Sequence, residues 1–372
     1  MIIFWIIAFI LVAAYILWIG LFYFGWIVIP EYLATGDKKI FVSVIIPVRN
    51  EQDNIGNLLN DLVRQEYPKD SFEIIIVDDH STDQTFDAIS AYTNQDTQVR
   101  YIRLEDDVQG KKQALLRGVN ESNHPVILTT DADCRIGAMW IKTLVACIEN
   151  TNADLVTGPV ILHGDNGFFY KFQQLEMLSL TGSAAGAIKT GNPVMCSAAN
   201  MGFRKSAYLE ARKTIYNHTS SGDDVFLLLS MHKSGKNIVY LKNPDSIVST
   251  RPSSGLAGFI NQRRRWASKS RYYNTSASVF TAFLVFLINI YAVVCLFAGF
   301  MNTSFLNISL FIFVGKSLID FPFLYSLTGF FQKRNLLYYF PVIQFLYFFY
   351  ISFTAVSALT SNFEWKGRNL KY

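Results

Sequence analysis

Two acidic segments of the chain each follow a short apolar run, a position from which carboxylates could bind a ligand. Asp78 and Asp79 come directly after residues 72–77, and there they could accept hydrogen bonds from a base or a ribose. The competing interpretation is an ordinary helix N-terminus, where Asp, Ser and Thr are common capping residues. Residues 131–133, Asp131-Ala132-Asp133, come directly after residues 125–130.

The spacing of Asp131 and Asp133 favours a divalent cation. Side chains two residues apart in an extended segment point in the same direction, so one or both carboxylates could hold the ion. Mg²⁺ and Mn²⁺ usually bind through one or two carboxylates together with substrate phosphates. An Asp-x-Asp sequence alone is weakly specific, and its position after an apolar run strengthens the prediction.

Two helix starts carry charged residues suited to phosphate binding and to proton transfer. Lys111 and Lys112 follow Gly110, and a lysine at a helix N-terminus favours phosphate, although a solvated first turn is an equal alternative. Asp223 and Asp224 precede an apolar helical run. Adjacent residues point in different directions there, so we expect one to face a cleft, as a potential general base, and the other to cap the helix.

The segment Gln262-Arg263-Arg264-Arg265-Trp266 combines three guanidinium groups with an indole. Arginine binds phosphate in a bidentate manner, and tryptophan offers a flat surface for a sugar ring. A basic cluster beside a membrane, which binds anionic lipid headgroups, is the alternative interpretation.

These segments fall into a repeating order of strands and helices. Apolar, β-branched runs predict strands, and apolar residues at helical spacing predict helices between them. The sequence thus predicts an α/β domain with a mainly parallel sheet, whose ligands bind at the carboxyl ends of the strands. We expect Ser81 or Thr82 to cap the second helix. The expected strands are residues 40–47, 72–77, 99–104 and 125–130, and the expected helices are 54–65, 82–92 and 111–119.

Charge is distributed very unevenly along the 372 residues, which contain 33 Lys and Arg and 29 Asp and Glu. Residues 1–30 carry no charge and residues 272–372 carry six basic and two acidic side chains, so residues 31–271 hold 27 of each sign. This pattern excludes a simple soluble enzyme and a disordered chain. The balanced middle also argues against nucleic-acid binding, which needs clustered positive charge. The four cysteines show no spacing typical of disulfide frameworks or zinc sites.

The two apolar flanks predict membrane-spanning helices. Residues 2–29 are uncharged and long enough to cross a bilayer, without the basic start and cleavage site of a signal peptide. The C-terminal flank contains three more candidates, residues 277–300, 305–330 and 337–359. We therefore expect a transmembrane anchor over residues 1–30, a catalytic domain over 31–271 and a membrane region over 272–372.

Basic residues beside these helices place the domain in the cytoplasm, on the inner or plasma membrane, by the positive-inside rule. They are Lys38 and Lys39, next to Asp37, and Lys333 and Arg334. Three complete crossings after the domain would put the basic tail, residues 365–368, outside, so either one segment does not fully cross or the rule fails for this tail.

Lys316 and Asp320 lie one helical turn apart inside the second C-terminal candidate. They could neutralise each other against neighbouring helices or line a polar path for a lipid or a sugar.

Taken in order, the motifs resemble those of membrane-bound glycosyltransferases of family 2, which include the hyaluronan, cellulose and poly-N-acetylglucosamine synthases. The resemblance covers residues 40–270 and extends to the flanks, including residues 365–368. Singly the motifs are weak, but six in the same order are specific. They are Ile46-Pro47-Val48-Arg49-Asn50-Glu51, Asp78-Asp79, Lys111 with Ala114-Leu115, Asp131-Ala132-Asp133, Asp223-Asp224 in place of the usual Glu-Asp, and Gln262 with Arg265-Trp266.

The resemblance implies a GT-A fold and an inverting transfer from a nucleotide-diphosphate sugar, with UDP favoured by the resemblance alone. It implies Mg²⁺ or Mn²⁺ held by Asp131 and Asp133, and Asp224 as the base that deprotonates the acceptor. Residues 196–205 resemble an acceptor-side segment of the family. The implied donor-binding residues are Pro47, Asn50, Glu51, Asp78, Asp79, Lys111 and Asp131, and the implied acceptor and pyrophosphate residues are Asp223, Gln262, Arg265 and Trp266.

The membrane region is smaller than in the polymer synthases, which form a channel from more helices. A single addition to a lipid, or polymerisation with a partner subunit for export, is therefore as consistent with the chain as autonomous export. The competing function is a catalytically silent membrane scaffold that binds a nucleotide sugar or a partner, and its expected sign, loss of a catalytic acid, is absent from the sequence. The identity of the sugar depends on pocket contacts that the sequence does not reveal.

Overall fold

The computed structural model describes residues 1–32, 40–94, 98–164, 167–213, 222–360, 363–365 and 368–370. Its centre is a seven-stranded sheet in the order β3-β2-β1-β4-β7-β5-β8. Pairing is parallel except where β7 lies antiparallel to β4 and β5, so the predicted mainly parallel sheet is confirmed. The strands are β1 Val42–Val48, β2 Phe72–Asp78, β3 Val99–Arg103, β4 Val126–Thr129, β5 Leu155–Thr157, β7 Met201–Arg204 and β8 Ile238–Tyr240.

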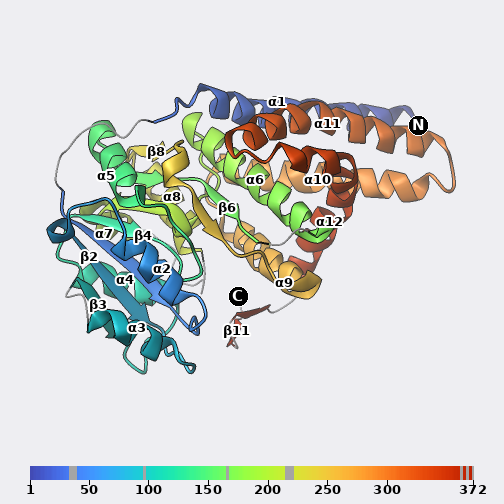
Figure 1. Ribbon diagram of the computed structural model, residues 1–372. Coiled ribbons are helices and arrows are strands. Elements are labelled where there is room, and N and C mark those ends of the chain that lie inside the picture. The colour runs from blue at the N-terminus through green and yellow to red at the C-terminus, as the bar shows by residue number, and fades with distance from the viewer. Residues whose placement is uncertain are drawn as a thin grey trace.

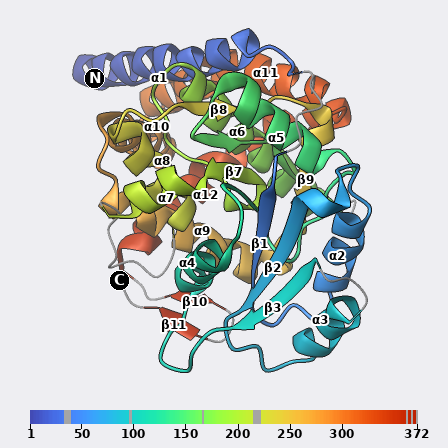
Figure 2. The ribbon, with the colours of Figure 1, turned by 90° about the vertical axis from the view of Figure 1, so that its left-hand side faces the viewer.

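Helices cover both faces of this sheet (Figures 1 and 2). Alternate residues of β1 face opposite layers, with Val44 and Ile46 in one core and Ile45 in the other. The first core includes α2 Ile55–Val63, α3 Thr85–Thr93 and α5 Trp140–Thr151. The second core contains α4 Lys111–Glu121, α7 Lys205–Arg212 and α8 Asp223–Lys233, and it continues without interruption into the apolar flanks of the chain.

The four predicted strands and three predicted helices are present, but the predicted cap of the second helix is wrong. That helix, α3, begins at Thr85, and Gln84 at its N-cap makes no side-chain capping bond. Ser81 instead donates to Asp78 through its backbone N–H and its hydroxyl, and the N–H of Thr82 donates to Asn50 Oδ1 at 2.8 Å. These residues are used to hold the loop between β2 and α3.

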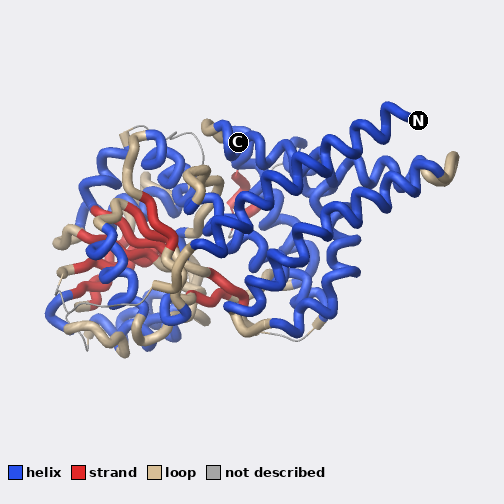
Figure 3. Tube along the Cα trace, turned by 90° about the horizontal axis from the view of Figure 1, so that it is seen from above, coloured by secondary structure: helices blue, strands red, loops and turns tan. Residues whose placement is uncertain are grey.

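Four helices are long and apolar enough to cross a membrane, as the sequence predicts. Three of them, α1 Ile2–Val28, α10 Ser276–Ala298 and α11 Ser304–Phe330, lie side by side and extend away from the sheet (Figures 1 and 3). The fourth comprises the 3-10 turn η5 Arg334–Tyr339 and α12 Phe340–Thr360. Asp37, Lys38 and Lys39, used above for orientation, lie outside the described residues.

Both ends of the fourth helix lie beside elements of residues 31–271. At its start, Lys171 of α6 Phe168–Lys189 donates to the Tyr339 hydroxyl at 2.7 Å. Near its end, Arg271 donates to the carbonyl of Ala358, and the short hairpin of β10 Phe363–Trp365 and β11 Arg368–Leu370 packs next to α9 Gly255–Ser268. This geometry fits the alternative in which one apolar segment does not cross completely. Residues 366 and 367 of the basic tail lie outside the described residues.

Lys316 and Asp320 join three apolar helices. The Lys316 ammonium, on a side chain only 1% exposed, donates to Asp320 at 2.9 Å and to the Tyr15 hydroxyl at 2.7 Å. Asp320 also accepts from Tyr15 and from Gln344 of α12. The pair is satisfied by these neighbours, which favours the neutralised, structural interpretation over an open polar path.

Helix α6 packs against the apolar helix α1 through a close glycine contact. A methyl group on Gly25 of α1 would lie 2.4 Å from the Gly186 carbonyl oxygen, and one on Gly186 would lie 1.9 Å from the Phe22 carbonyl oxygen. The two backbones touch at this point, as small residues permit where helices cross closely.

A buried ion pair holds α6 to α9 and α12. Arg263 of α9 forms three hydrogen bonds of 2.6–3.0 Å with the Glu176 carboxylate of α6, and the side chains are 4% and 2% exposed. The Tyr350 hydroxyl of α12 donates to the same carboxylate at 2.5 Å.

We expect Gly186→Ala to lower the stability of the protein because its methyl group would force α6 and α1 apart. Overpacking of this kind typically costs about 1–3 kcal/mol. Gly20→Ala, inside α1, is the matched control, since the nearest atom to its added methyl group is Ile319 Cδ1 at an ordinary contact distance of 3.8 Å. Thermal unfolding of the detergent-purified variants should show a lower Tm for Gly186→Ala only. Equal Tm values would contradict the close crossing.

Arg263→Met should destabilise the protein by about 3–5 kcal/mol, because it leaves the Glu176 carboxylate buried without its partner. The double variant Arg263→Met with Glu176→Met should recover most of that loss, since it removes both charges. Denaturant unfolding of the two single variants and the double variant measures this coupling. Additive losses in the double variant would show that the two side chains do not depend on each other.

Candidate active site

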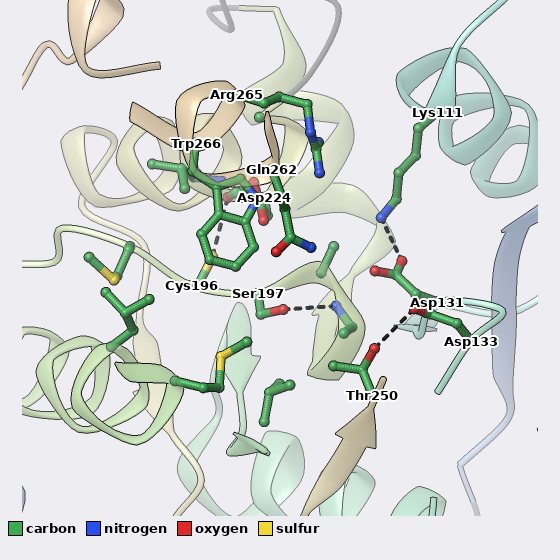
Figure 4. Close-up of a pocket in the computed structure, with 18 of the residues that line it drawn as sticks. Lys111, Asp131, Asp133, Cys196, Ser197, Asp224, Thr250, Gln262, Arg265 and Trp266 are labelled. Atoms are coloured by element: carbon green, nitrogen blue, oxygen red, sulfur yellow. Dashed lines mark hydrogen bonds and ion pairs between the residues drawn. The ribbon is translucent and has the colours of Figure 1, made fainter. Parts of the chain in front are cut away.

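A single cavity of about 790 Å³ contains most of the predicted site residues. It lies at the carboxyl ends of β1 and β4, and its wall continues along α6 and α9. Figure 4 shows residues from distant parts of the chain pointing into it. The predicted residues on its wall are Pro47, Glu51, Asp79, Lys111, Asp131, Asp133, Asp223, Asp224, Gln262, Arg265 and Trp266.

Two predicted donor-binding residues, Asn50 and Asp78, are not among the residues that line this cavity. Asn50 has a φ of 51° and holds the loop before α3 through Thr82. Asp78 is 2% exposed, and it accepts from Ser81 and from the Tyr101 hydroxyl at 2.9 Å. Its neighbour Asp79 does reach the cavity, and its carboxylate accepts from the Gly110 N–H at 3.1 Å.

Lys111, Asp131 and Asp133 form a charged cluster on one side of the cavity (Figure 4). The Lys111 ammonium lies 2.5 Å from Asp131, and the Thr250 hydroxyl donates to Asp133 at 3.0 Å. The prediction of an extended Asp131–Asp133 segment is wrong, because the Cys134 N–H donates back to the Asp131 carbonyl and closes a turn. The turn still brings both carboxylates to the wall of the cavity.

Burial and neighbouring charges shift the pKa values of Lys111 and Asp133 in this cluster. Burial by itself would lower the pKa of Lys111, but the carboxylates of Asp131, Asp223 and Asp224 outweigh it and hold that pKa above its ordinary value. Burial raises the pKa of Asp133, and the neighbouring carboxylates Asp131 and Glu51 raise it further. The cluster is therefore a place where an additional cation would relieve repulsion.

This cluster supplies part of the ligand set that a divalent cation requires. Among the described residues, no three His, Cys, Asp or Glu side chains gather into a complete metal cage. Asp131 and Asp133 supply two carboxylates, which is the usual protein contribution where Mg²⁺ takes its other ligands from water and substrate phosphates. The buried, mutually repelling carboxylates are the observation that supports the fit.

Asp224 lies apart from this cluster, beside Lys269 (Figure 4). Its carboxylate accepts from the Val225 N–H at 2.8 Å and lies 3.4 Å from the Lys269 ammonium. Burial raises the pKa of Asp224, but Lys269, the Val225 N–H and Lys111 together lower it below its usual value. The carboxylate is thus ionised at neutral pH and can accept a proton.

The prediction that only one of the two acids at this helix start faces the cleft is wrong. Asp223 and Asp224 both line the cavity, and Gly222 occupies the N-cap of α8 in a left-handed conformation. Among the residues that the structure describes, Oδ2 of Asp223 is buried and accepts no hydrogen bond. The helix start therefore presents two carboxylates to one volume.

Helix α9 separates its arginines by role. Gln262, Arg263, Arg265 and Trp266 all border the cavity, but the Arg263 guanidinium is paired with the buried Glu176 carboxylate. Gln262 Oε1 accepts from the Ser253 hydroxyl at 2.9 Å, and the Arg263 guanidinium lies 4.2 Å from the Trp266 ring centroid. The three consecutive arginines are thus not one basic patch, as the headgroup-binding alternative would require.

Several residues that line the cavity were not predicted from the sequence. Lys269 lies three residues after Trp266, and this helical spacing was the available signal for a cation on the same face. Thr250, Arg251 and Tyr273 line the cavity without any motif to mark them.

The predicted acceptor-side segment, residues 196–205, reaches the cavity only at its beginning, through residues 196–199. Asn200 is fully buried, and its amide donates to two backbone carbonyls. Arg204 and Lys205 bond to Glu149 and to the Ser122 carbonyl, at the other end of β7.

Comparison with known proteins finds relatives of the part of the chain that carries Lys111, Asp131 and Asp133. Residues 43–211 match the model of glycosyl transferase family 2. The chain is 37% identical over 131 residues to Glycosyltransferase AglE of Haloferax volcanii, covering 34% of this chain and 41% of that protein. It is 26% identical over 249 residues to Probable glycosyltransferase YdaM of Bacillus subtilis, covering 66% of this chain and 58% of that protein. The chain therefore spans about half the length of these curated relatives.

The fold resembles that of a solved structure along almost its whole length. The mannosyltransferase PcManGT from Pyrobaculum calidifontis, in complex with GDP-Man and Mn²⁺, superposes with a TM-score of 0.58 and 17% sequence identity. The match covers 95% of this chain and 99% of that chain, and it confirms the predicted GT-A fold. Residues 43–211 thus match glycosyl transferase family 2 within a GT-A fold, and helices apolar enough to span a membrane lie on both sides of this fold.

Proposed function

We propose that the protein is an inverting, metal-dependent glycosyltransferase that moves a sugar from a nucleotide-diphosphate donor, UDP being favoured, to a lipid or growing glycan. The observation that carries this proposal is the separation of two kinds of charge in one cavity. A cation-binding cluster, Lys111 with Asp131 and Asp133, lies on one side, and the ionised carboxylate of Asp224 lies apart from it (Figure 4).

The cluster suits the leaving diphosphate. Asp131 and Asp133 would hold Mg²⁺ or Mn²⁺, which supplies charge neutralisation for the diphosphate as the glycosidic bond breaks. Lys111 adds a fixed ammonium at the N-terminus of α4, where phosphate is favoured. Pro47, Glu51 and Asp79 line the neighbouring part of the cavity, where the nucleotide of the donor would lie.

Asp224 suits the acceptor. The carboxylate takes the proton from an acceptor hydroxyl, whose oxygen forms a bond to the anomeric carbon while the bond from that carbon to the diphosphate oxygen breaks. A single displacement of this kind inverts the anomeric configuration and requires no covalent intermediate. Asp223, Gln262, Arg265 and Trp266 border the same region, and the Trp266 ring offers a face for a sugar.

The similar proteins and the apolar helices support this assignment. The two curated relatives named above are described as glycosyltransferases, and the mannosyltransferase of similar fold was solved with a nucleotide sugar and Mn²⁺. The apolar helices would place the cavity at a membrane face, and Lys333 and Arg334 favour the cytoplasmic face of the inner or plasma membrane. A partner subunit would be needed if the product is an exported polymer.

We expect Asp224→Asn to lower the turnover number by about 10²–10⁴-fold, because the amide cannot accept the acceptor proton. Donor binding should persist, since the Lys111 cluster is unchanged. The measurement is nucleotide release from a panel of sugar nucleotides by detergent-purified protein, with Mn²⁺, Mg²⁺ or EDTA and with membrane lipid extract. Asp87→Asn, on an exposed position of α3, is the matched control.

Two outcomes would overturn this assignment. Near-normal turnover by Asp224→Asn would exclude Asp224 as the base. Donor binding without turnover by the unaltered protein, across the whole panel and with lipid extract present, would favour the silent scaffold.

The pH dependence of the transfer rate should be sensitive to the contact between Lys269 and Asp224. Because the ammonium helps to lower the pKa of Asp224, Lys269→Gln should raise that pKa, and the acidic limb of the pH–rate profile should move to higher pH. Lys269→Arg should keep the limb near its original position. An unchanged profile in Lys269→Gln would show that another group controls the acidic limb.

A further inference from the structure

The cavity has a second wall that the transfer chemistry does not use. Helix α6 contributes Met177, Leu180 and Ala184, which share one face at helical spacing, and Met195 lies on the same cavity. Val160 and Leu162 extend this apolar surface. We call Met177, Leu180, Ala184 and Met195 the α6 wall.

Polar residues on this side of the cavity are already bonded to the protein. The Thr181 hydroxyl donates to the Val160 carbonyl at 2.8 Å. The Gln173 amide donates to the Ser253 carbonyl at 3.2 Å and accepts from the Ser253 N–H at 2.9 Å. A sugar placed here would face mainly methyl, methylene and thioether groups and would lose the hydrogen bonds of its hydroxyls to water.

Helix α6 also packs against the helices that would cross the membrane. Gly186 meets α1 at Phe22 and Gly25, and Gly182 lies against Leu327 of α11. The α6 wall is therefore formed by a helix that lies between the catalytic cavity and the apolar helices (Figure 1). An apolar chain in this part of the cavity would lie close to the membrane from which it came.

We propose that the acceptor is a membrane lipid with a free hydroxyl, whose hydrocarbon chain lies on the α6 wall while its hydroxyl meets Asp224. This proposal rests on the proposed transfer reaction and selects the lipid from the two acceptor classes named there. Methionine side chains adapt to flexible hydrocarbon, and burial of methylene groups supplies affinity that a soluble glycan would not gain. The polar half of the cavity, with Asp224, Lys269 and Trp266, receives the headgroup.

The test uses the full-length protein in phosphatidylcholine vesicles with a radiolabelled sugar nucleotide. The probes are dioleoylglycerol, dodecyl β-glucoside, a lipid extract of the source membranes and, separately, soluble oligosaccharides. We expect label in the chloroform–methanol phase with at least one lipid probe. Label that enters only soluble oligosaccharide or a water-soluble polymer would overturn the proposal while leaving the glycosyltransferase assignment intact.

Variants connect this result to the α6 wall. Leu180→Gln should lower lipid labelling by about tenfold or more, since it places an amide where the chain lies. Leu209→Gln, on the exposed face of α7, is the matched control, and equal Tm values of the two variants check that Leu180→Gln is folded. Equal lipid labelling by Leu180→Gln and the unaltered protein would overturn the proposal. Absence of label from every lipid and oligosaccharide probe with the unaltered protein would instead contradict the proposed function itself.

Discussion

The buried contact of Glu176 with Arg263 and Tyr350 is the interaction on which the rest of the site depends. It joins α6 and α9, which line the cavity, to α12. A carboxylate and a guanidinium that are almost completely buried are costly to desolvate, and they are stable only when each satisfies the other. The pair therefore fixes where Gln262, Arg265 and Trp266 stand relative to the sheet, and it makes the position of α9 dependent on the packing of the apolar helices.

The other half of the site is positioned by the sheet. The buried strands β1 and β4 end at the same edge, so the loops that follow them meet there. The carboxylates of Asp131 and Asp133 are held in a turn and opposed by Lys111, and Asp224 is held apart beside Lys269. Several acids thus share one partly dry volume with different partners: Lys111 for Asp131, the Thr250 hydroxyl for Asp133 and Lys269 for Asp224.

Much of this could be predicted from sequence because it depends on local patterns. Apolar runs and helical periodicity correctly predicted the strands and helices of the first 130 residues and the apolar flanks. The expectation that ligand-binding residues follow the strands agrees with the positions of Asp79, Asp131 and Asp133, which line one cavity at that edge of the sheet. Local patterns did not reveal that Asn50 and Asp78 hold loops, that Arg263 is committed to Glu176, or that α6 forms a cavity wall. These outcomes depend on contacts between residues far apart in the chain, such as Arg263 and Glu176.

The close approach of Gly25 and Gly186 fixes the position of α6 relative to α1. Because backbone touches backbone there, α6 has no layer of side chains through which it could slide or tilt against α1. Under the proposed function, the carboxylate of Asp224 would then stand at a constant depth relative to the apolar helices. Acceptors would be selected by the distance between their reactive hydroxyl and the end that is anchored in the membrane.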